Sequence, residues 1–113
     1  MAETTPFIHQ DVTRITLSLL PPDHIDRHVF EVQVESRDLA KGRWTVLWLG
    51  RGLSKSTEEW EYEPLPSSRE DDWLDDHRFT YDEALLFAAK AVLALRVNGR
   101  TVQDLLQEVD GDA

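Results

Sequence analysis

The chain contains no cysteine, which excludes a disulfide framework, a thiol nucleophile and a thiolate zinc site. Its start carries Glu3 and no apolar core, so it does not resemble a secretory signal. The longest apolar stretch, Ala84–Val97, has 14 residues and includes Lys90 and Arg96. Because a bilayer needs about 20 apolar residues, we expect a cytoplasmic protein with no membrane contact.

Glycine is also scarce, with five residues in the chain. No glycine-rich phosphate-binding pattern occurs. The segment from Gly52 to Ser56, GLSKS, is not the G-x-S-x-G elbow of a nucleophilic serine. We therefore expect a protein that is not an enzyme and that carries no cofactor.

Basic residues are few and scattered: 12 lysines and arginines face 22 acidic residues, for a net charge of −10. Nucleic-acid binding needs a basic surface that displaces counterions, so we expect no direct binding. The charge is concentrated in residues 57–76, here called the acidic connector, which hold nine carboxylates and one arginine, a net charge of −8. Over the whole chain, arginine exceeds lysine, and alanine, valine and aspartate are abundant, a composition that suggests a GC-rich bacterial source.

The 113 residues suffice for one domain. Four stretches alternate apolar and polar side chains, as half-buried strands do. They start at Thr13, span His28–Glu35 and Arg43–Leu49, and include Trp60 and Tyr62. The third is apolar on both faces, which is typical of a central or covered strand. Short turns between them, including Gly50-Arg51-Gly52, predict an antiparallel meander.

Helical patterns follow the strands. Ser67 and Glu70 fit a capping box and predict a short turn over Ser68–Asp75. Thr80 and Glu83 form a second box, which opens a long helix over Tyr81–Val97 that ends at Asn98-Gly99. Thr101 caps a short last helix with apolar residues at helical spacing: Val102, Leu105, Leu106 and Val109.

The expected fold is therefore α+β in the order ββββαα, with the long apolar helix packed on one face of a four-stranded antiparallel meander. Residues 13–110 form the single domain. Residues 1–12 form a flexible N-terminal arm, and residues 111–113 form a disordered C-terminal end.

Strand alternation assigns side chains to the two faces of the sheet. Trp44, Trp48, Trp60 and Tyr62 fall on the helix-covered face and are interpreted as core aromatics. The other face presents Leu47 and Leu49 inside a rim of glutamates, which is the anatomy of a partner site. Two interpretations stay open: a partner covers these leucines, or the N-terminal arm does so through Phe7 and Ile8.

We interpret this face and the acidic connector as a docking surface for a protein with a basic surface. Its expected residues are Leu47, Leu49, Glu59, Glu61, Glu63, Glu70, Asp71, Asp72, Asp75 and Asp76.

The long helix is more apolar than packing on a sheet requires. Leu86, Phe87, Leu93 and Val97 are the expected self-association residues. Their cover is either the last helix, a second copy of the chain or a different partner. A homo-oligomer, with a dimer favoured, is the expectation.

Two clusters raise the question of a metal. Asp71, Asp72, Asp75, Asp76 and His77 lie close in sequence, and His24, Asp26 and His28 form another group. Neither matches the calcium-loop pattern, which needs a glycine at its turn, nor a three- or four-ligand zinc set. We expect no metal site.

The leading hypothesis is thus a small, acidic, non-enzymatic interaction or regulatory module. One alternative is an acidic mimic of nucleic-acid phosphates that inhibits a DNA- or RNA-binding protein. The other is a small-ligand or metal-binding protein, or an enzyme, that uses the carboxylates, His77 and the tryptophans.

Overall fold

The computed structural model describes residues 8–111. Its strands are β1 (Arg14–Leu17), β2 (Val32–Asp38), β3 (Arg43–Trp48), β4 (Arg51–Leu53), β5 (Trp60–Glu61), β6 (Arg96–Val97) and β7 (Arg100–Thr101). Its helices are α1 (Asp71–His77), α2 (Tyr81–Ala94) and α3 (Val102–Gly111), with 3-10 turns at Arg27–Val29 and Pro66–Ser68. Residues 1–7 of the expected arm and residues 112–113 of the expected C-terminal end lie outside the described residues.

The main sheet is an antiparallel meander of five strands in the order β1-β2-β3-β4-β5, with β3 at its centre. The expected α+β class is confirmed, but the expected four strands are five. Leu49 and Gly50 form the turn between β3 and β4, since both have positive φ, 49° and 78°. Paired positive φ values are typical of a two-residue hairpin, so Arg51 and Gly52 lie in a strand rather than in the predicted turn.

The long helix is shorter than predicted. α2 ends at Ala94, because Leu95 has an extended backbone, with φ −61° and ψ 135°. Arg96–Val97 then pairs with Arg100–Thr101 as the hairpin β6–β7. Asn98 and Gly99, predicted as a helix stop, form its two-residue turn with φ of 53° and 76°. Asn-Gly serves both purposes in proteins, and the sequence pattern alone did not separate them.

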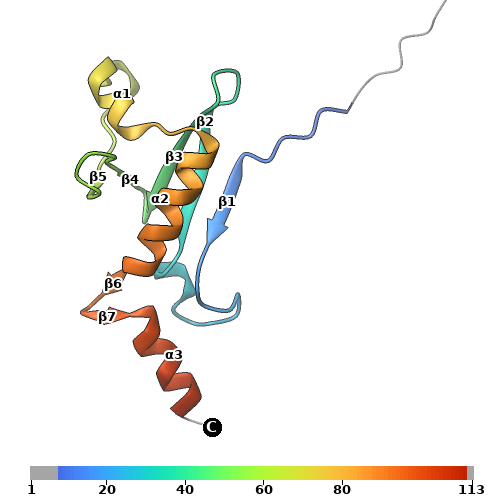
Figure 1. The fold of residues 1–113 in the computed structure, drawn as a ribbon, viewed down its shortest axis with the longest axis vertical. Helices are drawn as coiled ribbons and strands as arrows, with labels where there is room; N and C mark the ends of the chain where they lie inside the picture. Colours follow the sequence, from blue (N-terminus) through green and yellow to red (C-terminus); the bar gives the residue numbers. More distant parts are fainter. Residues whose placement is uncertain (1–7, 112–113) are drawn as a thin grey trace, which may run out of the picture.

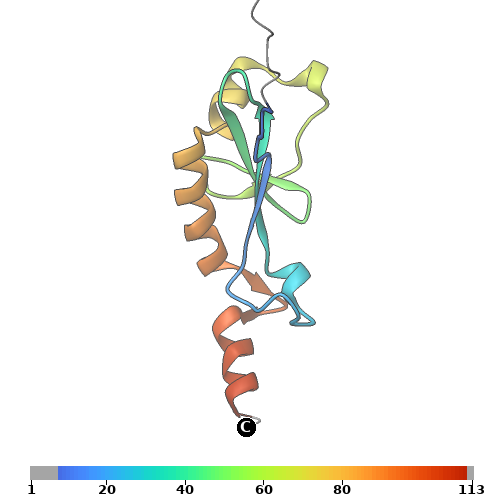
Figure 2. The same ribbon diagram turned by 90° about the vertical axis from the view of Figure 1, so that its right-hand side faces the viewer.

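α2 covers one face of the sheet (Figure 2) and packs mainly on β2 and β3. Ala84, Ala88 and Val92 of the helix are buried, and so are Val34 and Val46 of the strands. The two small alanines let the helix approach the sheet closely. Residues just before α2 also join the sheet, because Phe79 and Trp44 exchange backbone hydrogen bonds of 2.9 and 2.8 Å.

The other face of β3 is covered too. The segment between β5 and α1 passes over the side of the sheet opposite α2 (Figure 2). Thr45 and Leu47 are buried there, with Leu47 only 7% exposed. The expected exposed apolar centre is therefore wrong: Leu47 is covered, and Leu49 is exposed because it lies in the β3–β4 turn. Ile8 is 95% exposed and covers neither leucine, while Phe7 lies outside the described residues.

Two of the predicted helix caps form and one does not. Glu83 N donates to Thr80 Oγ1 at 3.2 Å and Thr80 N donates to Glu83 Oε1 at 2.9 Å, as a capping box requires. Thr101 caps α3 in the same way, through Asp104. Ser67 instead lies in the 3-10 turn, and α1 starts after Glu70 without a side-chain cap.

α3 extends past the end of α2 beyond the β6–β7 hairpin (Figure 1). Val102 and Leu105 at the start of α3 are buried in the hydrophobic core. α3 therefore does not cover the outer side of α2. Among residues 8–111, no helix is long and apolar enough to cross a membrane.

Candidate functional site

Besides Glu58, which pairs with Lys90 of α2 at 2.6 Å, three carboxylates tie the acidic connector to the fold. The first is Glu61, whose Oε2 lies 2.5 Å from Nε2 of the buried His77. The other ring nitrogen of His77 lies 2.8 Å from the carbonyl oxygen of Trp73. Both ring nitrogens of His77 therefore have a hydrogen-bond partner inside the protein. Trp73 stacks on the imidazole with ring centroids 4.3 Å apart and planes 7° apart.

The second carboxylate is Glu63, which forms ion pairs with three arginines. Its oxygens lie 3.0 Å from Arg78, 3.4 Å from Arg37 and 3.5 Å from Arg69. Burial by itself would raise the pKa of Glu63, but the charges of these arginines and the hydrogen bond from Arg78 lower it below its ordinary value. Arg78 is itself buried, and this burial lowers its pKa, a shift that Glu63 opposes.

The third carboxylate is Asp76, which binds the loop between β4 and β5. Its oxygens accept hydrogen bonds from Ser54 Oγ at 2.5 Å and from Ser56 N at 2.8 Å. The hydrogen bond from the Ser54 hydroxyl is the main reason that the pKa of Asp76 is lowered. The backbone oxygen of Asp76 also accepts from Lys55 N at 2.8 Å.

The expected docking carboxylates thus divide into two groups. Glu61, Glu63 and Asp76 hold the fold together and are not a free acidic face. The others are exposed and, among the described residues, take part in no ion pair: Glu59, Glu70, Asp71, Asp72 and Asp75. Four of these five cluster at the start and along the outside of α1.

The self-association residues also divide. Leu86 and Leu93 are 73% and 67% exposed on the outer side of α2. Phe87 instead packs on Phe79, with ring centroids 5.0 Å apart, and Val97 packs against the core from β6. Only the first two are therefore available to another chain.

The expected core aromatics separate in the same way. Trp44 is buried, and Trp48 and Trp60 pack against the core. Tyr62 is 75% exposed, which corrects its expected place in the core. Arg51 covers its ring instead and donates to the hydroxyl oxygen at 2.9 Å.

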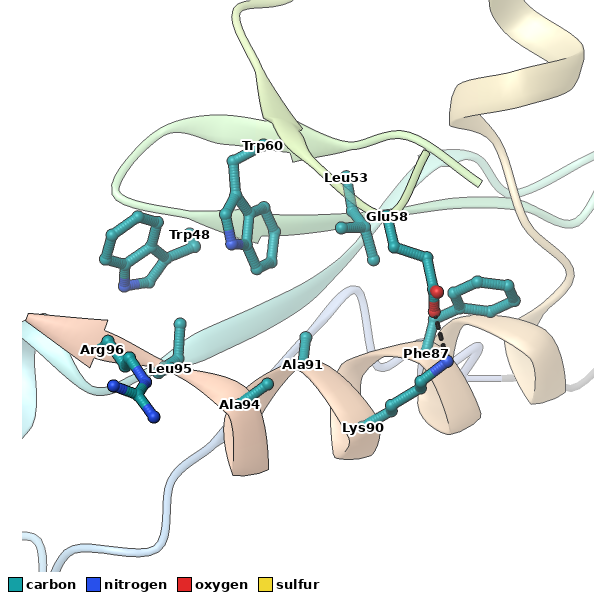
Figure 3. Close-up of a pocket in the computed structure, with 10 residues that line it drawn as sticks. All are labelled: Trp48, Leu53, Glu58, Trp60, Phe87, Lys90, Ala91, Ala94, Leu95 and Arg96. Atoms are coloured by element: carbon teal, nitrogen blue, oxygen red, sulfur yellow. Dashed lines mark hydrogen bonds and ion pairs between the residues drawn. The ribbon is translucent and has the colours of Figure 1, made fainter. Parts of the chain in front are cut away.

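An apolar cleft lies between α2 and the β3–β5 edge of the sheet (Figure 3). The small-ligand alternative named the tryptophans, but the sequence did not predict a cleft at this position, and His77 does not line it. Its volume is about 380 Å³. Trp48 and Trp60 line the sheet side, and Ala91 and Ala94 line the helix side. The available signal was the pair of alanines, one helical turn apart, on a helix otherwise rich in leucine.

The candidate metal-ligating residues make other contacts. Within the part of the chain that the structure describes, no three histidine or acidic side chains are placed to hold a metal ion. His24 and His28 make local backbone hydrogen bonds, His24 Nδ1 with Asp26 N and His28 Nδ1 with Ile25 O. His77 is enclosed by Glu61 and Trp73, which leaves no open ligand position on its ring.

The geometry therefore offers three surfaces: the exposed carboxylates around α1, the outer leucines of α2 and the tryptophan-lined cleft. Comparisons with protein-family models, with curated protein sequences and with solved structures find no match to this chain.

Proposed function

We propose that this protein is a small interaction module that self-associates through the outer side of α2 and docks a basic protein surface on α1. The observation that carries the proposal is the exposure of Leu86 and Leu93. Large apolar side chains grouped on an exposed face are a feature of interaction sites.

The two leucines lie on one face because they are seven residues apart in a helix, which is close to two full turns. The buried residues Ala84, Ala88 and Val92 face the sheet, so the leucines point to the opposite side. Ala89, between them, is also exposed. Neither α3 nor any other described element shields this face.

A second copy of the chain fits this face by symmetry. In an antiparallel pair of α2 helices related by a two-fold axis near Ala89, Leu86 of one copy lies beside Leu93 of the other. The small side chain of Ala89 allows a close approach at the axis. The two leucine contacts are then equivalent, as an isologous interface requires.

The basic partner is proposed for the exposed carboxylates around α1. Glu70, Asp71, Asp72 and Asp75 are displayed at the start of and along α1, a short helix that His77 joins to β5 through Glu61. An acidic surface on an ordered scaffold speeds the encounter with a basic partner and rejects acidic ones. The internally paired carboxylates keep that scaffold in place.

Sedimentation equilibrium tests the self-association. We expect the wild-type chain to be a dimer, Leu93→Glu to be a monomer and Ile25→Glu to remain a dimer. Ile25 is a suitable control because it is 84% exposed and far in sequence from α2. A wild-type monomer at high concentration, or a dimer that both variants retain, would refute this half of the proposal.

The docking part of the proposal is tested with two variants that have the same net charge. Asp71→Asn/Asp72→Asn and Asp11→Asn/Asp23→Asn each remove two exposed carboxylates, but only the first pair lies on α1. Basic proteins captured from a lysate at low salt should be lost with the first variant and kept with the second. Equal capture by both variants would show that net charge alone attracts these proteins.

A further inference from the structure

The cleft beside α2 has walls from two sources (Figure 3). Trp48, Leu53 and Trp60 come from β3, β4 and β5, while Phe87, Ala91 and Ala94 come from α2. The alanines leave open the space that larger helix side chains would fill. A volume of about 380 Å³ lies at the lower end of the range for small-molecule pockets, about 300–1,000 Å³. One or two fused rings fit this size, whereas a dinucleotide cofactor does not.

The tryptophan wall is formed in advance of any ligand. The Trp48 indole nitrogen donates to the carbonyl oxygen of Val29 at 3.0 Å, which fixes the ring. Trp60 packs on Trp48 with ring centroids 5.8 Å apart and planes tilted by 44°. Two fixed indoles facing a helix favour a flat, apolar guest, since aromatic pairs gain from offset or edge contacts as well as from burial.

Charged groups lie at both ends of the cleft. At one end, Lys90 Nζ lies 2.6 Å from Glu58 Oε1, so these two charges neutralise each other. At the other end lies Arg96 (Figure 3). Among the described residues no carboxylate lies within ion-pair distance of its guanidinium, although Asp104 interacts with it at longer range.

We propose that this cleft binds a small planar aromatic carboxylate. The ring system lies between the tryptophans and the alanines, and the carboxylate faces Arg96. A guanidinium presents paired donors that match the two oxygens of a carboxylate.

This site is separate from the proposed dimer surface. Phe87, Ala91 and Ala94 face the β4–β5 side of α2, while Leu86 and Leu93 point to its outer side. Ligand binding and self-association can therefore be tested independently.

The probe is 2-naphthoate, with the neutral 2-naphthamide as its matched analogue. Calorimetric titration should show naphthoate binding about three- to fivefold more tightly than the amide, the range expected for one partly exposed ion pair. Naphthoate should also shift the indole N–H resonances of Trp48 and Trp60 in ¹H–¹⁵N spectra.

Three variants locate the binding. Arg96→Gln should bring the two affinities to within twofold of each other, whereas Lys41→Gln, which removes an exposed cation elsewhere, should preserve the preference. Ala94→Phe should fill the cleft and abolish binding of both probes; Ala94 is exposed, so the fold tolerates the ring. The proposal is overturned by an absence of naphthoate binding at millimolar concentration, by an equal affinity for the amide, or by indole resonances that do not move. Unchanged binding to Ala94→Phe would likewise overturn it.

Discussion

Nε2 of His77 lies 2.5 Å from Oε2 of Glu61, although 16 residues separate them in the chain. This contact joins α1 to β5 and turns one acidic residue of the connector into a structural one. The buried imidazole in turn stacks on Trp73, and the guanidinium groups of Arg69 and Arg78 lie 5.6 and 5.1 Å from the centre of the same Trp73 ring. The carboxylates of the connector thus fall into those that hold the scaffold and those that the scaffold displays.

The Glu61–His77 contact predicts a selective loss of stability. Glu61→Gln keeps the side-chain shape but removes the charge that faces the buried ring, so we expect the free energy of unfolding to fall by about 1–2 kcal/mol. Urea denaturation followed by tryptophan fluorescence measures the change. Glu59→Gln is the matched control, since Glu59 is exposed, and its effect should stay within about 0.5 kcal/mol. Equal effects of the two substitutions would argue against a structural role for Glu61.

Glu63 predicts a dependence of stability on pH. Glu63→Gln leaves the buried Arg78 without its carboxylate, and we expect a loss of about 3 kcal/mol at pH 7. The pKa of Glu63 is lowered in the folded protein. Its stabilising effect is therefore complete above the unfolded-state value of about 4.3 and is lost as the pH falls through the lower folded value.

The difference between wild type and Glu63→Gln should accordingly be constant near neutral pH and shrink below about pH 4. Urea titrations at several pH values measure it. Glu35→Gln provides a surface comparison, because Glu35 pairs with Arg37 at 2.9 Å in a more exposed position, and should cost at most about 1 kcal/mol. If the stability difference between wild type and Glu63→Gln increased at acidic pH, the lowered pKa of Glu63 would be contradicted.

Asp76 and its neighbour Asp75 form a second internal comparison. Asp76→Asn weakens the hydrogen bonds to Ser54 and Ser56, so the β4–β5 loop should loosen and stability should fall by about 1–2 kcal/mol. Asp75→Asn changes an exposed side chain with the same chemistry and should have little effect. Amide hydrogen exchange at Ser56 reports the local change, and unaltered exchange in Asp76→Asn would refute the link.

The N-cap of α2 should contribute to stability through the hydroxyl oxygen of Thr80. Thr80→Ala removes the oxygen that accepts from Glu83 N and should lower the free energy of unfolding by about 1 kcal/mol. Thr80→Ser keeps that acceptor and should retain most of the stability. Thermal unfolding followed by circular dichroism compares the two; similar melting temperatures for Ala and Ser would mean that the cap contributes little.

Local features of the sequence determined much of the secondary structure. Alternation over His28–Glu35 and Arg43–Leu49 predicted the central strands, although the first begins only at Val32, after the 3-10 turn at Arg27–Val29. The Thr80–Glu83 spacing predicted the start of α2. These features act over a few neighbouring residues, so they can be recognised without the fold. The turns were not determined by local sequence. Gly50-Arg51-Gly52 and Asn98-Gly99 are each compatible with more than one backbone structure, and the pairing of the flanking strands selects one of them.

Only the tertiary structure determines which charged side chains are paired and which apolar side chains are exposed. Glu61 and Glu63 alternate with Trp60 and Tyr62 as the side chains of an exposed strand face do, yet their partners come from α1, β2 and the segments flanking α1. The exposure of Leu86 likewise depends on α3 passing beyond α2 instead of folding over it. Sequence determines which side chains are charged or apolar and how they repeat along the chain. Which of them are neutralised, covered or left exposed depends on contacts between segments far apart in sequence, and only the tertiary structure brings those segments together.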